Sequence, residues 1–234
     1  MRERRKLIIG EDFKWFLNKK LKHINNLINK SNFFTYETYI FDFDGTLVLS
    51  NEIKREGFFI SVKNFEYGSE IINDILRSDT RIDRYFIFKK FSEIICKEKT
   101  KQVSIYEKCL KNYGDYTLKK IIELKPIQGS VELLNKLKII KKKLYINSAT
   151  PSTYLELILK NRNLNIYFNK IFGMEGNKLE NLKKIKEDSK TLKNKIIMIG
   201  DGKDDLKAAN EFNIKFYPVG INLTGTFPNF KSLI

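Results

Sequence analysis

The sequence has very few residues of the types that bind zinc or form disulfides. Its single histidine, His23, excludes sites built on several imidazole ligands and argues against a His-based catalytic triad. The two cysteines, Cys96 and Cys109, have no second pair or histidine nearby, a pattern typical of neither a zinc site nor a disulfide framework. We therefore expect a reduced protein in the cytoplasm.

Long apolar runs are also missing. No run approaches the roughly 20 residues that a membrane-spanning helix needs. The N-terminus is basic, but its apolar stretch, Leu7–Ile9, is too short for the core of a signal peptide. We expect neither a transmembrane segment nor a signal peptide.

Acidic residues are outnumbered by basic ones. The 44 lysines and arginines against 28 acids give a formal net charge of +16. A nucleic-acid or anionic-membrane footprint needs these charges gathered on one face, and here they are spread along the whole chain. We favour a diffuse, solvated charge and expect no specific nucleic acid. A nucleic-acid-binding protein, or a phosphatase of nucleic-acid ends, stays as an alternative.

The hydrophobic pattern divides the chain into three parts. The stretch 38–44 is strand-like, residues 50–125 contain several helical stretches and no convincing strand, and helices alternate with strands after Pro126. Alternation of this kind predicts an α/β fold with a parallel sheet covered on both faces. The expected domains are a core of residues 36–49 and 126–234, a helical insert of residues 50–125 and an N-terminal extension of residues 1–35. The expected helices are 130–142, 151–161, 179–188 and 205–212, and the later strands are 144–147, 170–172, 196–199 and 214–217.

Residues 11–30 carry apolar side chains at helical spacing, with lysine and asparagine between them. We expect an amphipathic helix that packs on the core. Contact with a partner or a membrane surface is the alternative use of such a stripe.

Polar side chains stand at or shortly after the ends of four predicted strands. They are Asp42 and Asp44 at the end of the first, Ser148 after the second, Lys178 shortly after the third, and Asp201 with Asp205 after the fourth. Ligands of parallel sheets bind beyond the carboxyl ends of strands, so these groups are expected to converge. Carboxylates with a hydroxyl and a lysine suit Mg²⁺ and a phosphate, and the crowded acids would repel one another without a cation.

These residues, read as DFDGTL, Ser148, Lys178 and GDGKDD, resemble the four motifs of the haloacid dehalogenase superfamily of phosphohydrolases, in the right order and over about residues 38–220. The resemblance implies a Rossmann-like core with an inserted α-helical cap, at residues 50–125, of the C1 type found in phosphoglycolate-phosphatase-like members. It also implies Mg²⁺ as cofactor and a small phosphorylated metabolite as substrate.

Residue roles follow from the same resemblance. Asp42 is similar to the nucleophile that becomes an aspartyl phosphate, and Asp44 to the general acid/base. Asp201 and Asp205 resemble the acids that bind Mg²⁺ together with Asp42 and the backbone carbonyl of Asp44. The phosphate-binding group would consist of Thr46, Ser148 and Lys178.

For some residues the sequence allows either a functional or a purely structural role. Asp204 serves either the site or the cap of the following helix. We interpret Thr150, before Pro151, as a helix N-cap first and a ligand second. Arg81 and Arg84 are candidates for substrate binding from the cap, and a solvated basic helix face is the alternative. The motifs also do not separate a phosphatase from a sugar phosphomutase, because the two differ only in whether water or a second hydroxyl accepts the phosphoryl group.

Overall fold

The computed structural model describes residues 30–78, 83–226 and 228–234. The amphipathic helix predicted over residues 11–30 therefore lies outside the described residues apart from its last position, and so does Arg81. Within the described part, no helix is both long enough and apolar enough to span a membrane.

Five parallel strands form one sheet in the order β3-β2-β1-β4-β5. Their bounds are β1 (Thr38–Phe41), β2 (Lys143–Asn147), β3 (Lys170–Phe172), β4 (Ile196–Gly200) and β5 (Lys215–Pro218). From β1 the chain builds outward through β2 and β3, then returns to place β4 and β5 on the other side of β1. The strand order thus reverses at β1 and β4, which pair directly. The predicted parallel sheet is confirmed.

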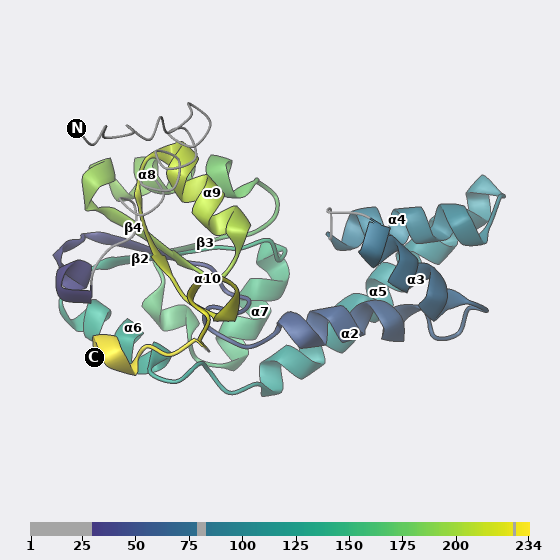
Figure 1. Ribbon diagram of the computed structural model, residues 1–234, viewed down its shortest axis with the longest axis horizontal. Helices are drawn as coiled ribbons and strands as arrows, with labels where there is room; N and C mark the ends of the chain where they lie inside the picture. The colour runs from purple at the N-terminus through teal and green to yellow at the C-terminus, as the bar shows by residue number, and fades with distance from the viewer. Residues whose placement is uncertain (1–29, 79–82, 227) are drawn as a thin grey trace, which may run out of the picture.

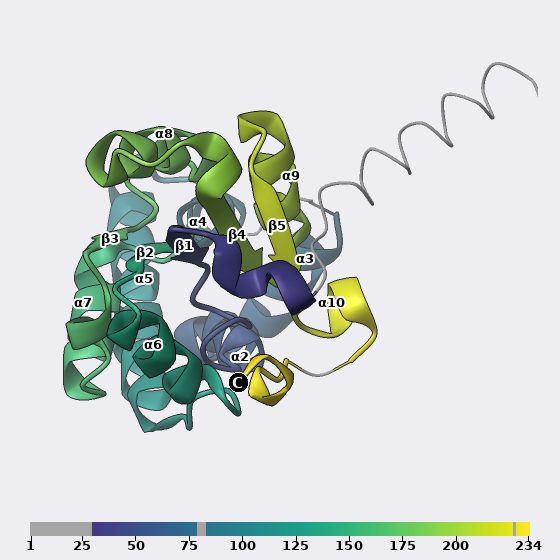
Figure 2. The same cartoon turned by 90° about the vertical axis from the view of Figure 1, so that its left-hand side faces the viewer.

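Helices cover both faces of the sheet (Figure 2). They are α6 (Ser130–Ile139) and α7 (Ser152–Asn161) on one face, and α8 (Lys178–Ser189) and α9 (Lys203–Phe212) on the other. Successive side chains of a strand point to opposite faces, so in β1 Tyr39 and Phe41 join the first core cluster while Ile40 joins the second. Both faces are therefore apolar, which explains strands without polar alternation.

Residues 50–125 form a helical insert between β1 and α6, seen on the right of Figure 1. Its helices are α2 (Asn51–Val62), α3 (Gly68–Ser78), α4 (Arg84–Ile95) and α5 (Lys99–Glu123). They pack around a hydrophobic cluster of their own that includes Phe58, Ile72, Phe88 and Tyr113. The predicted helical character of this stretch is confirmed, and its separate cluster allows it to behave as a unit.

The first strand is shorter than its sequence indicates. We expected strand through residue 44, but β1 ends at Phe41 and the chain then folds into a tight turn. The Leu47 amide donates to the Phe43 carbonyl at 2.9 Å, and the Gly45 amide donates to the Val48 carbonyl at 2.7 Å. This turn needs the left-handed backbone of Gly45, whose φ is 76°. It turns Asp44 out of the sheet.

The remaining described elements are short. They are the 3₁₀ turns η1 (Lys30–Thr35), η2 (Asn165–Tyr167), η3 (Lys193–Lys195) and η4 (Lys231–Leu233), and the helix α10 (Ile221–Thr224).

Candidate active site

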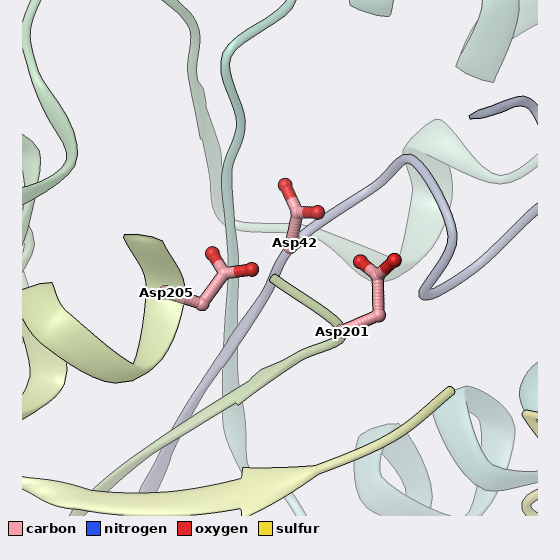
Figure 3. A group of neighbouring side chains, drawn as sticks. All are labelled: Asp42, Asp201 and Asp205. Carbon is pink, nitrogen blue, oxygen red and sulfur yellow. The ribbon is translucent and has the colours of Figure 1, made fainter. Parts of the chain in front are cut away.

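Three carboxylates meet at the carboxyl end of the sheet (Figure 3). Asp42 follows β1, Asp201 follows β4 and Asp205 lies in the first turn of α9. One oxygen from each lies within 4.8 Å of the others, and all three residues are buried. The four-motif prediction placed these acids together, and the geometry agrees.

Strand order explains why they meet. β1 and β4 are neighbours at the point where the order reverses, which is where parallel sheets open a crevice for ligands. The Asp42 amide still donates to the Ile199 carbonyl at 2.9 Å, so the first residue after β1 keeps the register of the sheet. The Asp205 carboxylate accepts from the Gly202 amide at 3.0 Å, which fixes it at the start of α9.

Burial raises the pKa of all three acids. Burial raises the pKa of Asp42 well above its ordinary value, and the charges of Asp205, Asp44 and Asp201 raise it further against the opposing effect of Lys178. Burial likewise raises the pKa of Asp205, to about 6. A divalent cation would relieve both the desolvation and the repulsion, and a set of carboxylate oxygens is the ligand chemistry that Mg²⁺ prefers. The residues present therefore fit a magnesium ion.

Lys178 is the cation of this cluster. Its Nζ lies 3.5 Å from Asp42 Oδ1 and 2.9 Å from Asp204 Oδ2, and it also donates to Asp205. Burial lowers the pKa of Lys178, but the three acids outweigh this effect and hold the pKa above its ordinary value. The three acids therefore favour the charged form of this lysine. Asp204 contacts it from a more exposed position, so its use at the site gains support over a purely capping one.

The chain positions Lys178 at a cost. It is the first residue of α8, where the helix dipole disfavours a positive charge. Asn177 and Glu180 form a capping box that fixes this helix start. The buried side chain of Asn147 donates to the Lys178 carbonyl at 3.0 Å and accepts from Asn181 at 3.0 Å. These contacts fix the start of α8, and with it the backbone of Lys178, next to the acidic cluster.

Asp44 lies in a different environment from the other acids. Ser50 donates to its Oδ1 at 2.5 Å, Thr150 donates to its Oδ2 at 2.8 Å, and Lys54 forms an ion pair with it. Ser148 lies 3.4 Å from Oδ2. Burial raises the pKa of Asp44, but Lys54 and the hydroxyl donors outweigh it and lower the pKa below its ordinary value. Its side chain thus does not join the three-carboxylate group.

The predicted phosphate ligands differ in their present contacts. The buried Thr46 hydroxyl donates to Asp201 Oδ1 at 3.2 Å, and Asn51 donates to Asp201 Oδ2 at 3.1 Å. Ser148 is buried beside Asp44, as stated above. Thr46 therefore orients a carboxylate in this structure, and Ser148 lies beside Asp44.

The interpretation of Thr150 as a helix cap is wrong. The N-cap of α7 is Pro151, with no side-chain cap, and the Thr150 hydroxyl instead bonds Asp44 and accepts from Lys54 at 2.6 Å. Sequence reasoning also missed Ser50 and did not foresee that Lys54 contacts Asp44. The only available signal was their closeness to the DFDGT stretch, which cannot show that α2 folds back over it.

Arg84 does not lie on a solvated helix face. It is only 9% exposed, and its guanidinium carbon lies 4.6 Å from the ring centroid of Tyr113. The alternative given above, a solvated basic face, is therefore wrong for this residue.

Comparison with known proteins identifies the family. The family model described as haloacid dehalogenase-like hydrolase matches residues 39–219. The chain belongs to this family. The match includes all the core site residues and the insert, so the hydrolase fold and class that the motifs implied are confirmed.

Solved structures with the same fold come from several bacteria. A "putative phosphatase" from Clostridium difficile is 26% identical, with 79% of this chain and 85% of that chain covered and a TM-score of 0.58. A predicted phosphoglycolate phosphatase from Haemophilus somnus is 15% identical over 85% and 89% of the two chains, with a TM-score of 0.63. A "putative beta-phosphoglucomutase" from Thermotoga maritima is 20% identical over 79% and 85%, with a TM-score of 0.62. A search among curated proteins gave no match.

Proposed function

We propose that this hydrolase is a Mg²⁺-dependent phosphatase that acts on a small phosphomonoester through an aspartyl phosphate on Asp42. The observation that carries the proposal is the position of Asp42: its carboxylate lies between two further acids and Lys178 at the reversal of strand order. The names of the neighbouring structures, a phosphatase and a phosphoglycolate phosphatase among them, support the same class.

The nucleophile must be ionised to attack phosphorus. Burial and the neighbouring acids work against ionisation, and Lys178 works for it. Asp42, Asp201 and Asp205 would hold the Mg²⁺, together with the backbone carbonyl of Asp44. When bound, the ion supplies positive charge that keeps Asp42 ionised and neutralises the phosphate oxygens.

In the first step, an Asp42 oxygen forms a bond to phosphorus while the ester P–O bond breaks. Asp44 gives its proton to the departing oxygen, which leaves as an alcohol. Lys54, Ser50 and Thr150 favour the carboxylate form of Asp44, and the negative phosphate of the substrate favours the protonated form that this step needs.

In the second step, Asp44 accepts a proton from water as the water oxygen bonds to phosphorus. The bond between phosphorus and the Asp42 oxygen breaks, and inorganic phosphate and the free carboxylate result. Lys178, beside Asp42, stabilises the negative charge in both steps, Ser148 donates to a phosphate oxygen, and the Thr46 hydroxyl orients Asp201.

The helical insert of residues 50–125 acts as a cap in this proposal. Lys54 of α2 reaches the Asp44 carboxylate and Thr150, so the insert contributes directly to the core site. Movement of the insert would open the site to substrate and, on closing, exclude bulk water. The cytoplasmic location expected from the cysteine use stays a prediction.

The test is phosphate release from a panel of sugar phosphates, phosphoglycolate and nucleotides, with and without chelator. Release should require Mg²⁺ and disappear in Asp42→Asn, while Asp74→Asn, which removes an exposed acid of α3, serves as the matched control. A phosphomutase would instead isomerise a sugar phosphate without releasing phosphate. Full release in excess chelator, or by Asp42→Asn, would contradict the proposal.

A further inference from the structure

Arg84 is a buried cation with no acid to balance it. It is 9% exposed, and within the described ranges of the chain its guanidinium makes no hydrogen bond or ion pair. The adjacent acid, Asp83, accepts from the Phe86 amide at 2.9 Å and caps α4. Most of this side chain is removed from water, which is unfavourable for a charge. None of its nitrogen atoms is fully enclosed by the described residues, so its unpaired N–H groups are open to a ligand.

The position of Arg84 on its helix adds to the cost. It is the first residue of α4, where the helix dipole disfavours a positive charge. The same end of a helix, with its free amides, favours an anion. The start of α4 and the unpaired guanidinium therefore both favour binding of an anion.

Two tyrosines hold the guanidinium in place. Its central carbon lies 4.6 Å from the ring centroid of Tyr113, on α5, and 5.6 Å from that of Tyr154, on α7. Stacking on aromatic rings offsets part of the burial cost and leaves the N–H groups of the guanidinium unused. An arginine fixed in one orientation with unused donors is suited to bind a carboxylate or a phosphate with two parallel hydrogen bonds.

This arginine lies where the insert meets the catalytic core. Tyr113 belongs to the insert and Tyr154 to the core, and α5 packs on α7. A Cβ placed on Gly114 would lie 2.2 Å from the Tyr154 hydroxyl, so the two helices approach closely next to Arg84. Burial raises the pKa of the Tyr113 phenol, the charge of Arg84 lowers it, and the charge of Asp44 raises it. Tyr113 therefore lies close enough to both Arg84 and Asp44 to interact with their charges.

We propose that Arg84, between Tyr113 and Tyr154, binds a second anionic group of the substrate, a carboxylate or a second phosphate, at the end away from the transferred phosphoryl group. The transferred group already has Lys178 beside Asp42, so it does not account for Arg84. This inference rests on the proposed phosphatase function. The substrate class is then a short phosphomonoester with an anionic far end.

The test compares three compounds with one three-carbon skeleton: 3-phosphoglycerate, glycerol 1,3-bisphosphate and glycerol 3-phosphate, whose far ends are a carboxylate, a phosphate and a neutral hydroxymethyl group. Each competes against hydrolysis of p-nitrophenyl phosphate, so its inhibition constant is measured whether or not it is itself hydrolysed. Wild type should bind at least one of the anionic compounds about 10- to 100-fold more tightly than glycerol 3-phosphate. Whichever compound is preferred identifies the anion.

The preference should fall to within about 3-fold in Arg84→Ala. It should persist in Arg77→Ala, which removes an exposed arginine of α3 and is the matched control. Should Arg84→Ala fail to fold, Arg84→Gln, which keeps a planar side chain without charge, gives the same comparison. The ratio of constants within one variant is the readout, because a merely structural role would change the three constants together.

Two outcomes would overturn the proposal, and they differ in meaning. No hydrolysis of p-nitrophenyl phosphate by wild type with Mg²⁺ would overturn the phosphatase function and this inference with it. Hydrolysis with three similar inhibition constants, or a preference that survives in both Arg84 variants, would overturn this inference alone.

Discussion

Asp42→Asn should stabilise the metal-free protein although it abolishes turnover. The ionised Asp42 carboxylate is within 4.8 Å of two further carboxylates and 3.5 Å from the Lys178 ammonium. With an effective dielectric constant of about 20, each repulsion costs about 3.5 kcal/mol and the attraction contributes about 5 kcal/mol. The net cost of ionising Asp42 is therefore about 2 kcal/mol before desolvation is counted, and an uncharged isostere removes it.

The effect should depend on pH in a stated direction. Because the pKa of Asp42 is raised in the folded state, this group contributes stability at low pH, and that contribution is lost as the pH rises through the folded-state pKa. The loss begins once the pH exceeds the unfolded-state pKa and grows from there, so the wild type is less affected at pH 5 than at pH 8.5. The stabilising effect should therefore appear mainly at the higher pH.

The assay is thermal melting of wild type, Asp42→Asn and the exposed control Asp74→Asn, each in chelator at both pH values. For a chain of 234 residues, about 2 kcal/mol corresponds to a rise of about 4–8 °C in Tm. Added Mg²⁺ should raise the Tm of wild type more than that of Asp42→Asn, because the variant lacks one ligand. A lower Tm for Asp42→Asn at pH 8.5, or an equal rise at both pH values, would refute the reasoning.

Two other substitutions test the surroundings of the site. Lys54→Met should lower kcat about 10- to 100-fold and move the acidic limb of the pH–rate profile to higher pH. The reason is that burial raises the pKa of Asp44 once its main neighbouring cation is removed. Lys63→Met, at an exposed lysine, is the control, and an unshifted profile in Lys54→Met would contradict the role of Lys54. Gly45→Ala should abolish activity and lower Tm, since φ is 76° and the new Cβ would lie 2.1 Å from Asp201 Oδ2. Gly225→Ala separates backbone strain from the collision, because φ at Gly225 is 73° and an added Cβ would meet nothing within 4 Å. An equal loss of stability in both variants would mean that the collision with Asp201 contributes nothing.

The core of the site could be predicted because its residues occupy fixed places relative to the strands. Asp42 and Asp201 follow strands that pair with each other, so a correct strand order places their side chains close together. Lys178 was found for the same reason, although its place at the first position of α8 was not.

Contacts between the insert and the core could not be predicted. Lys54 and Thr150 meet although they are 96 residues apart, and their contact depends on how α2 lies over the end of the sheet. Nothing in the periodicity of a helix fixes that docking. Thr150 was misread because a threonine before a proline is a common helix start, and here tertiary contacts gave the hydroxyl a different partner.

Arg84 shows a second limit of the sequence. A basic residue on an amphipathic helix usually points to solvent, and only the packing of α4, α5 and α7 reveals that this one is enclosed by two tyrosine rings. Burial of a charged residue therefore carries functional information that composition and spacing do not.

The most direct test of the central claim is chemical trapping of the covalent intermediate. The enzyme is mixed with Mg²⁺ and a phosphomonoester that it hydrolyses, and the reaction is quenched in acid during turnover. Borohydride is then added, which reduces an aspartyl phosphate to homoserine. Peptide mass spectrometry should then find homoserine at position 42 in wild type, and none in samples without substrate or without Mg²⁺. Full phosphate release with unmodified Asp42, or homoserine at a different aspartate, would contradict the account.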